Sequence, residues 1–351
     1  MGELSFQDAG DTLKIWAEDC GGPQGQEVFV STFIPPFRMF ADVDRSIYYP
    51  HYFSWMGEAR EMSVLPVLQR LNQWMGSGRW GLVTNSASVE VVGETMGENN
   101  IVCVRMWSGL PSNASVDMTF DWWSMAPDGP LERIALGRMK TTWVEVLRHG
   151  SVKPAELPSF YADFLKRVGP QYDAPDTLPT LPEPLRDVSL GETLFKAKQG
   201  PRAEVPLATK SFETSQYHSN IVSNIYFSNY AMWLAKMREH YFWSIAPQLY
   251  VPGAQPGVLK CLHCAVHHLR EVMPFEVIEV TMALRGLYGN GVELYFEFFR
   301  KNPDGTRTKV AYGDHRAAWM AKGADGRSQV RPLPPELARP LRQAATALIH
   351  A

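Results

Sequence analysis

The second half of the chain shows one helical pattern followed by four strand-like runs. Apolar side chains recur at helical spacing from Tyr230 to Tyr241, and the other faces of this stretch are apolar as well. A helix that is apolar nearly all round is normally buried. The runs that follow are separated by turn signals and cover 257–270, 275–287, 291–300 and 308–320. The pattern predicts one buried helix and an antiparallel meander around it, which is an α+β unit.

The first half of the chain repeats this order of elements. We expect a helix at 51–62 and strands at 82–92, 100–107, 114–123 and 134–147. Each unit then consists of a central helix wrapped by a curved antiparallel sheet. Two such units in one chain can pair as an intramolecular pseudo-dimer, and further homo-oligomers remain compatible with that arrangement.

Three sequence blocks recur in order and support a tandem duplication. The first is Tyr48–Trp55 followed by Arg60, which corresponds to Tyr226–Trp233 followed by Arg238 at an offset of 178. The second pairs 93–97 with 270–274 at an offset of 177. The third pairs Ala135-x-Gly137 and Trp143 with Ala311-x-Gly313 and Trp319 at an offset of 176. A nearly constant offset is the mark of an internal repeat.

The repeat predicts the domain organisation. We expect an N-terminal unit at 27–168 and a C-terminal unit at 207–336. Residues 169–206 contain seven prolines and show no sustained periodicity, so they are expected to form a linker. Residues 337–351 are expected to form a C-terminal helix or tail.

Composition and charge narrow the range of partners. The chain has 351 residues, with 34 basic and 37 acidic side chains and a formal net charge of −3. It has no long run of Lys or Arg, so it lacks the electrostatic footprint of nucleic-acid or anionic-membrane binding. No apolar stretch approaches the roughly 20 residues of a membrane span. With only four cysteines and no apolar signal core at the start, we expect a reduced, cytoplasmic protein.

Two cysteines and three histidines lie close together on one of the predicted strands. Thiolate and imidazole are the usual ligands of zinc. On a regular strand, however, Cys261, His263 and His267 share one face, whereas Cys264 and His268 point to the other. Because only three ligands then converge, we expect a half-buried strand, no metal site and no cofactor.

The residues around the second predicted helix resemble a known family. The run from Asn220 to Tyr230, followed by Trp233 and Arg238-Glu239, is similar to the signature of the thioesterases of enediyne polyketide synthesis, which have the hot-dog fold. The resemblance covers most of 210–321 and, more weakly, about 27–160. It implies a tandem, or double, hot-dog architecture.

The resemblance also implies a site. In that family the active site lies between paired hot-dog units, beside the N-terminus of the central helix, and a phosphopantetheine arm carries the thioester. By position, the functional residues fall on Asn220, Tyr230 and Arg238. Thioester hydrolysis builds negative charge on the carbonyl oxygen, and helix N-terminal amides, an arginine and a tyrosine hydroxyl can stabilise that charge. Because Asn220 is not an acid, water attack at this place would depend on oxyanion stabilisation.

The first half resembles the 4-hydroxybenzoyl-CoA thioesterase branch, which has a catalytic Asp. An ungapped alignment puts Asp42 on the catalytic position, whereas matching the Asp-x-Asp pattern puts Asp44 there after a two-residue deletion. Both alignments stay open. Tyr52 and Arg60 occupy the positions that correspond to Tyr230 and Arg238.

Each candidate also has a purely structural interpretation. The arginines can form ion pairs with neighbouring carboxylates, the tyrosines can be core aromatics, and Asn220 can belong to a turn before the helix. Four further candidates would line the substrate site: Trp233, Trp55, Tyr226 and Asn229. The two tryptophans fit a core or a pocket wall better than chemistry.

The leading functional prediction is a thioesterase that releases an acyl or polyketide chain from an acyl carrier protein or from coenzyme A. A carrier-dependent acyltransferase/decarboxylase or a dehydratase of polyketide or fatty-acid biosynthesis is the alternative enzyme class. A non-catalytic acyl-chain binder is the alternative without chemistry.

Overall fold

The computed structural model describes most of the chain. The described residues are 29–33, 35, 39, 46–93, 101–109, 111–125, 131–148, 151–168, 204–251, 257–324 and 328–350. They form two compact units. Unit 1 contains the described residues up to 168 together with Ser219–Ser228. Unit 2 contains 204–218 and the described residues from 229 onward.

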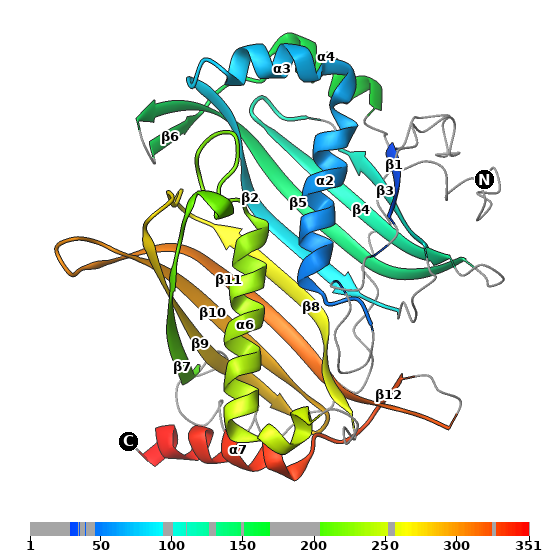
Figure 1. The fold of residues 1–351 in the computed structure, drawn as a ribbon, viewed down its shortest axis with the longest axis vertical. Helices are drawn as coiled ribbons and strands as arrows, with labels where there is room; N and C mark the ends of the chain where they lie inside the picture. Colours follow the sequence, from blue (N-terminus) through cyan, green and yellow to red (C-terminus); the bar gives the residue numbers. More distant parts are fainter. Residues whose placement is uncertain are drawn as a thin grey trace. The chain divides into compact units, whose positions relative to one another are not determined.

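Unit 1 places one long helix against an antiparallel sheet of six strands (Figure 1). Its elements are β1 (Phe29–Phe33), α2 (Pro50–Ser63), the 3-10 turn η2 (Leu65–Val67), α3 (Leu68–Met75), β2 (Trp80–Val91), β3 (Ile101–Ser108), β4 (Ser115–Met125), β5 (Leu131–Arg148), β6 (Ser151–Pro154) and α4 (Ser159–Val168). The helix begins with Pro50 at its first position, where a missing N–H costs nothing. Side chains on several sides of α2 are buried, among them Phe53, Met56 and Ala59.

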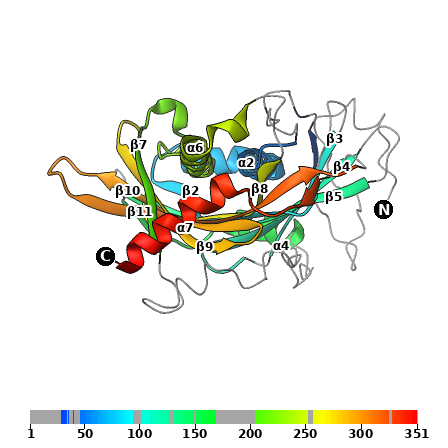
Figure 2. The same cartoon turned by 90° about the horizontal axis from the view of Figure 1, so that it is seen from below.

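Unit 2 repeats this arrangement around a longer helix. Its elements are β7 (Val205–Glu213), η4 (Gln216–His218), α6 (Ser228–Ile245), η5 (Pro247–Tyr250), β8 (Val258–His268), β9 (Val277–Tyr288), β10 (Gly291–Lys301), β11 (Arg307–Lys322), β12 (Ser328–Val330) and α7 (Pro335–His350). Figure 2 shows α6 on one face of its sheet. The predicted helices and strands of both halves are therefore confirmed, with ends that differ by a few residues.

The strand order corrects the predicted meander. The order is β1-β3-β4-β5-β2 in unit 1 and β7-β9-β10-β11-β8 in unit 2. In each unit the first strand after the helix, β2 or β8, pairs with the last strand of the predicted meander, β5 or β11. The next strand along the chain, β3 or β9, pairs instead with a strand that precedes the helix, β1 or β7. Local sequence patterns predict where strands occur but not which strands pair. The predicted meander therefore has the wrong pairing for β2 and β8, and it does not include β1 and β7.

The strand registers show that the repeat is structural. Val91, at the end of β2, pairs with Ala135, and His268, at the end of β8, pairs with Ala311. These two alanines open the third sequence block of each half. The short elements that follow also correspond: β6 and α4 in unit 1 match β12 and α7 in unit 2.

A glycine in each third block lets the central helix approach the sheet. A Cβ on Gly137 would lie 2.9 Å from the Cε of Met56 on α2 and 2.6 Å from the ring of Trp122. A Cβ on Gly313 would lie 3.3 Å from a Cδ of Leu234 on α6. Met56 and Leu234 are themselves equivalent positions, at the offset of 178. The spacing of the repeat therefore preserves the crossing of helix and sheet.

The predicted alternation along β8 is wrong at one point. The register between β8 and β11 shifts between His263 and Cys261, so Leu262 is an extra residue in the ladder. A bulge of this kind moves the following side chains to the other face. Consistently, Cys261 and Cys264 are both buried, with exposed fractions of 7% and 0%. A regular two-residue alternation would have separated them.

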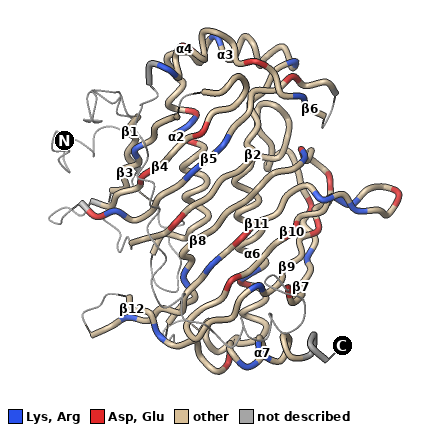
Figure 3. Tube along the Cα trace, turned by 180° about the vertical axis from the view of Figure 1, so that it is seen from behind, with Lys and Arg blue, Asp and Glu red and all other residues tan. Residues whose placement is uncertain are grey.

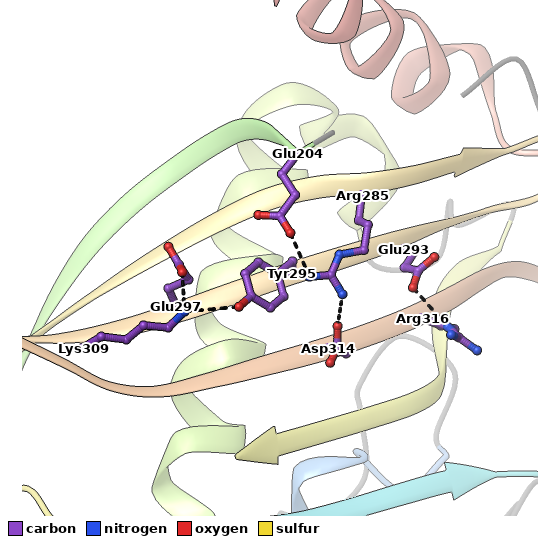
Figure 4. Close-up of polar contacts among 8 residues, drawn as sticks. All are labelled: Glu204, Arg285, Glu293, Tyr295, Glu297, Lys309, Asp314 and Arg316. Carbon is purple, nitrogen blue, oxygen red and sulfur yellow. Dashed lines mark hydrogen bonds and ion pairs between the residues drawn. The ribbon is translucent and has the colours of Figure 1, made fainter. Parts of the chain in front are cut away.

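Charged residues lie along the strands of the unit 2 sheet (Figure 3), and on the face away from α6 their side chains pair with one another (Figure 4). Arg285 on β9 bridges Glu204, at 2.8 Å, and Asp314 on β11, and its guanidinium lies 4.0 Å over the ring of Tyr295. Two further pairs join Lys309 to Glu297 and Arg316 to Glu293. Such part-exposed pairs contribute little stability each. We interpret this face as a solvated surface, and the candidate site residues lie around the two long helices instead.

The predicted domain boundaries stay a prediction. The predicted linker, 169–206, lies outside the described residues except for its last three. The boundary at 336 falls inside α7, which belongs to unit 2.

Candidate functional site

Tyr230 lies in the first turn of α6 and is enclosed by other rings. Its exposed fraction is 2%. Between ring centroids, it is 5.3 Å from Phe298 on β10, 5.2 Å from Trp233 and 4.5 Å from the imidazole of His268. Burial raises the pKa of the Tyr230 hydroxyl far above its usual value, and the negative charge of Glu271 adds to the shift. The hydroxyl therefore keeps its proton and is a hydrogen-bond donor at physiological pH.

His268 is the last residue of β8 and meets Tyr230 edge to face. The planes of the two rings make an angle of 89°. His268 as a whole is half-buried, but its Nε2 atom is buried and has no hydrogen-bond partner among the described residues. Burial and the charge of neighbouring His267 lower the pKa of His268 to about 3. The imidazole is therefore neutral at physiological pH, and with its proton on Nδ1 it offers Nε2 as an acceptor.

The lowered pKa of His268 predicts a loss of stability in mild acid. The unfolded chain takes up the proton near pH 6.5, whereas the folded chain resists it down to about pH 3, so the contribution is complete above pH 6.5 and is lost as the pH falls from 6.5 to 3. The ring of Tyr230 on α6 contacts His268, the charge of His267 acts on it, and Glu271 and Glu276 act on the adjoining Tyr230. We expect the free energy of unfolding to fall by about 1–2 kcal/mol from pH 7 to pH 5 through this group.

Chemical denaturation at several pH values measures this effect. The control is His268→Val, which takes its side chain from the equivalent position, Val91. The difference between wild type and variant should change with pH between 5 and 7. A difference that is constant over this interval would contradict the prediction.

Arg238 lies on the same helix as Tyr230 but contacts a different side chain, His315. Its exposed fraction is 7%, and Nη1 lies 3.0 Å from Nε2 of His315 on β11. Burial and the charge of Arg238 lower the pKa of His315 well below its usual value, so that Nε2 accepts this hydrogen bond. Eight residues separate Arg238 from Tyr230, a distance of about 12 Å along a helix. Within unit 2, the two predicted site residues do not meet at one carbonyl group.

Arg60 is the equivalent arginine of unit 1 and has a different set of neighbours. Its exposed fraction is 8%. The guanidinium donates to Oγ1 of Thr84 at 3.1 Å, to Oε1 of Glu61 at 3.3 Å and to the hydroxyl of Tyr226 at 3.4 Å. It also contacts Sδ of Met139 at 3.8 Å, the position that corresponds to His315. A buried cation with these polar neighbours can stabilise a developing negative charge.

Tyr226 belongs to unit 1 and reaches the same carboxylate as Arg60. Its hydroxyl donates to Oε1 of Glu61 at 2.7 Å. The ring lies 5.8 Å from the Arg60 guanidinium. Room for the hydroxyl comes from Gly57 on α2, because a Cβ there would lie 2.0 Å from the Tyr226 oxygen. Tyr226, a predicted substrate-binding residue, therefore shares one polar cluster with Arg60, a predicted catalytic residue.

Asn220 is held in a turn of the same segment. Its Oδ1 accepts a hydrogen bond from the N–H of Val222 at 3.0 Å, and the carbonyl of Asn224 accepts one from the N–H of Asn220 at 3.1 Å. Val222 faces β2, where a Cβ on Gly81 would lie 3.3 Å from it. Asn220 thus lies in unit 1, while Tyr230 and Arg238 lie in unit 2. This turn is the structural role that the sequence left open for Asn220.

The remaining predicted site residues lie in well-packed places or outside the described residues. Tyr52 is in ring contact with Trp122 at 5.3 Å and with Trp55 at 5.6 Å. Trp55 and Trp233 have exposed fractions of 1% and 2%. Nδ2 of Asn229 donates to the carbonyl of His218 at 3.0 Å. Asp42 and Asp44 lie outside the described residues.

Two neighbours of the candidate residues, His268 and His315, do not follow from the resemblance. In the sequence His268 is one member of the cysteine–histidine run, and no local motif marks His315. The signal that finds them is the register of the repeat, because the first half has Val91 and Met139 at these positions. A polar residue in one copy and an apolar residue in the other marks a place where the two copies have diverged.

No group of three His, Cys, Asp or Glu side chains suited to a metal ion occurs among the described residues. Within the same part of the chain, no helix has both the length and the apolar character needed to cross a membrane.

Comparisons with known proteins agree with the sequence resemblance. Residues 219–341 match the model of the Thioesterase-like superfamily. No curated protein sequence matches the chain. Among solved structures, an acyl-ACP thioesterase from Bacteroides thetaiotaomicron is 11% identical, with a TM-score of 0.53, covering 83% of this chain and 97% of that one. The 12:0-ACP thioesterase from Umbellularia californica is 13% identical, with a TM-score of 0.55, covering 86% and 94%.

A shorter structure matches part of the chain. The dynemicin thioesterase is 27% identical, with a TM-score of 0.37, covering 40% of this chain and 97% of that one. The two longer matches extend over most of this chain at identities that establish the fold alone. The chain is a tandem hot-dog protein of α+β class whose residues 219–341 match the Thioesterase-like superfamily.

Proposed function

We propose that this protein is a thioesterase that hydrolyses an acyl or polyketide thioester of an acyl carrier protein or of coenzyme A. The match of 219–341 to the Thioesterase-like superfamily supports the reaction class. The observation that carries the proposal is Tyr230, a buried and protonated tyrosine in the first turn of the central helix of unit 2.

The first turn of α6 supplies the donors that this reaction needs. The first four N–H groups of a helix have no partner within it, and the helix dipole makes this end positive. A thioester carbonyl at this end would accept hydrogen bonds from these amides and from the Tyr230 hydroxyl. When water attacks the carbonyl carbon, the charge on oxygen grows and these bonds strengthen. The tetrahedral intermediate then expels the thiol of the pantetheine arm, which acyl carrier proteins and coenzyme A share.

The polar cluster of unit 1 is a second place with suitable chemistry. Arg60 and the Tyr226 hydroxyl both contact Oε1 of Glu61. A guanidinium is always charged at physiological pH, so Arg60 can hold an anionic group. Arg60 already has the carboxylate of Glu61 beside it, at 3.3 Å, so Tyr230 is the better candidate for the donor.

The release of free thiol tests the proposal. Wild-type protein is incubated with acyl-pantetheine, acyl-CoA and acyl-carrier substrates, beside Tyr230→Phe and the control Tyr241→Phe near the other end of α6. We expect Tyr230→Phe to lower kcat about 100-fold or more, because it removes one donor from the oxyanion, and we expect the control to stay near wild type.

Intact-mass analysis separates the other outcomes. An acylated protein would identify an acyltransferase, and a carrier-bound substrate that loses one water would identify a dehydratase. A loss of thiol release in Arg60→Met, with full activity in Tyr230→Phe, would move the reaction to the cluster of unit 1. If the wild type releases no thiol from any of these substrates, the proposed reaction is wrong for them.

A further inference from the structure

Hydrolysis at the first turn of α6 needs an acceptor for the proton of the attacking water. The second repeat has Asn220 where the related branch has an acid, and an amide is not a base. We propose that His268 is a further catalytic residue of the proposed thioester hydrolysis, and that its Nε2 accepts the proton of the attacking water beside Tyr230. This inference rests on the proposed function and adds the base that the proposed site lacks.

The geometry places the imidazole next to the donor that defines the site. His268 ends β8, and its ring centroid is 4.5 Å from that of Tyr230, at an angle of 89°. The contact joins a side chain of the first helical turn to one at the end of a neighbouring strand. Its Nε2 is buried and has no hydrogen-bond partner among the described residues. A buried polar atom without a partner is costly, so its presence calls for a role.

The other repeat provides an internal comparison. Val91 has the same register as His268: Val91 pairs with Ala135, and His268 pairs with Ala311. The tyrosine is present in both copies, as Tyr52 and Tyr230, and packs on an aromatic side chain of the equivalent strand in both. The fold therefore accommodates an aliphatic side chain at this position. The imidazole is specific to the copy that has Asn220 in place of an acid before its helix.

The two copies differ in a complementary way along the sequence. The first has aspartates before its helix, at Asp42 and Asp44, and Val91 at the end of β2. The second has Asn220 before its helix and His268 at the end of β8. The two copies thus differ at two equivalent positions of the repeat: the first has a carboxylate before its helix, and the second has an imidazole at the end of β8.

The step balances without any other reactant. Water oxygen forms a bond to the carbonyl carbon, the carbonyl π electrons move to oxygen, and one water proton passes to Nε2. The oxyanion then re-forms the carbonyl group, the C–S bond breaks, and the thiolate takes the proton from the imidazolium, which leaves a carboxylic acid and a thiol. Burial keeps the imidazole neutral before the reaction, and the adjacent oxyanion favours its protonated form during it.

His268→Val tests the inference, because unit 1 shows that valine fits this register. We expect kcat to fall about 100-fold, the magnitude typical of a general base, with KM changed less than about threefold. The variant should unfold at no lower temperature than the wild type, because it removes a buried polar atom without a partner. A role in folding alone would instead lower the unfolding temperature and leave kcat unchanged.

Chemical rescue provides a second measurement. His268→Ala leaves space for a small base, so added imidazole should restore part of the lost kcat, whereas it should not accelerate the wild type. His240→Val, at an exposed histidine ten residues after Tyr230 on α6, is the control and should keep kcat within about twofold of wild type.

The outcomes separate the two proposals. Wild-type hydrolysis with an unchanged kcat in His268→Val overturns the role of His268 and leaves the thioesterase proposal standing. A fall in kcat that imidazole does not restore, together with a lower unfolding temperature, also overturns it. A wild type that hydrolyses no thioester overturns the thioesterase proposal, and the role of His268 with it.

Discussion

Gly137→Ala is expected to destabilise the protein by about 2–3 kcal/mol. A Cβ at this position would lie 2.6 Å from two ring atoms of Trp122 and 2.9 Å from Cε of Met56. Both side chains have exposed fractions of 0%. The indole is rigid and enclosed on all sides, so α2 must move away from the sheet or Trp122 must leave its rotamer. Alanine would by itself favour a strand over glycine by about 0.5–1 kcal/mol, and the clash outweighs this gain.

Denaturant unfolding of the full chain measures the effect. Gly289→Ala is the control, because a Cβ there would meet no atom within 4 Å. We expect it to change the free energy of unfolding by less than about 0.5 kcal/mol. The double variant Gly137→Ala, Trp122→Phe uses the smaller ring that unit 2 has at the equivalent Phe298. It should recover part of the loss, and additive effects of the two substitutions would show that the Trp122 contact is not the cause.

Much of the fold could be predicted from the sequence because its signals are local or repeated. The apolar circumference of the stretch from Tyr230 to Tyr241 predicts a buried helix, and Tyr230, Trp233, Leu234 and Met237 of α6 are buried. The three blocks at offsets of 176 to 178 predict the duplication, and the strand registers reproduce it. Neither inference needs knowledge of which strands pair.

The errors arise where pairing partners decide the outcome. Composition along 257–287 suggests two consecutive strands that pair, yet β8 pairs with β11 because β7 occupies the edge beside β9. The face of each side chain on β8 depends on the extra residue at Leu262, which exists only in relation to the opposite strand. Single-chain periodicity contains no information on either point.

In the candidate site, too, the sequence identifies single residues but not the contacts between distant segments. The resemblance identified Tyr230 and Arg238, but one helix separates them by about 12 Å, which follows from helical rise as soon as the helix is continuous. His268 comes 38 residues after Tyr230 in the sequence, and only the return of β8 along α6 brings the rings together. Contacts between distant segments are therefore what the sequence analysis missed.

Gly57→Ala is expected to destabilise the protein by about 1–2 kcal/mol, although alanine favours a helix interior by about 1 kcal/mol over glycine. The equivalent position of α6 is Ala235, which is fully buried, so the helix itself tolerates the methyl group. In unit 1 a Cβ would lie 2.0 Å from the hydroxyl oxygen of Tyr226 and 2.8 Å from Cζ. The ring must swing away as a whole, and its hydrogen bond to Glu61 breaks.

The background Tyr226→Ala is the decisive control for this prediction. With the ring removed, Gly57→Ala should stabilise the protein by about 1 kcal/mol, so the sign of the effect reverses between the two backgrounds. Denaturant unfolding of the four proteins of this cycle provides the measurement. If Gly57→Ala lowers the free energy of unfolding equally in both backgrounds, then Tyr226 is not what requires glycine at this position. The reversal would establish that glycine is required at position 57 because the Tyr226 hydroxyl lies against it. It would also show that Tyr226 holds this position beside Arg60 and Glu61 in solution.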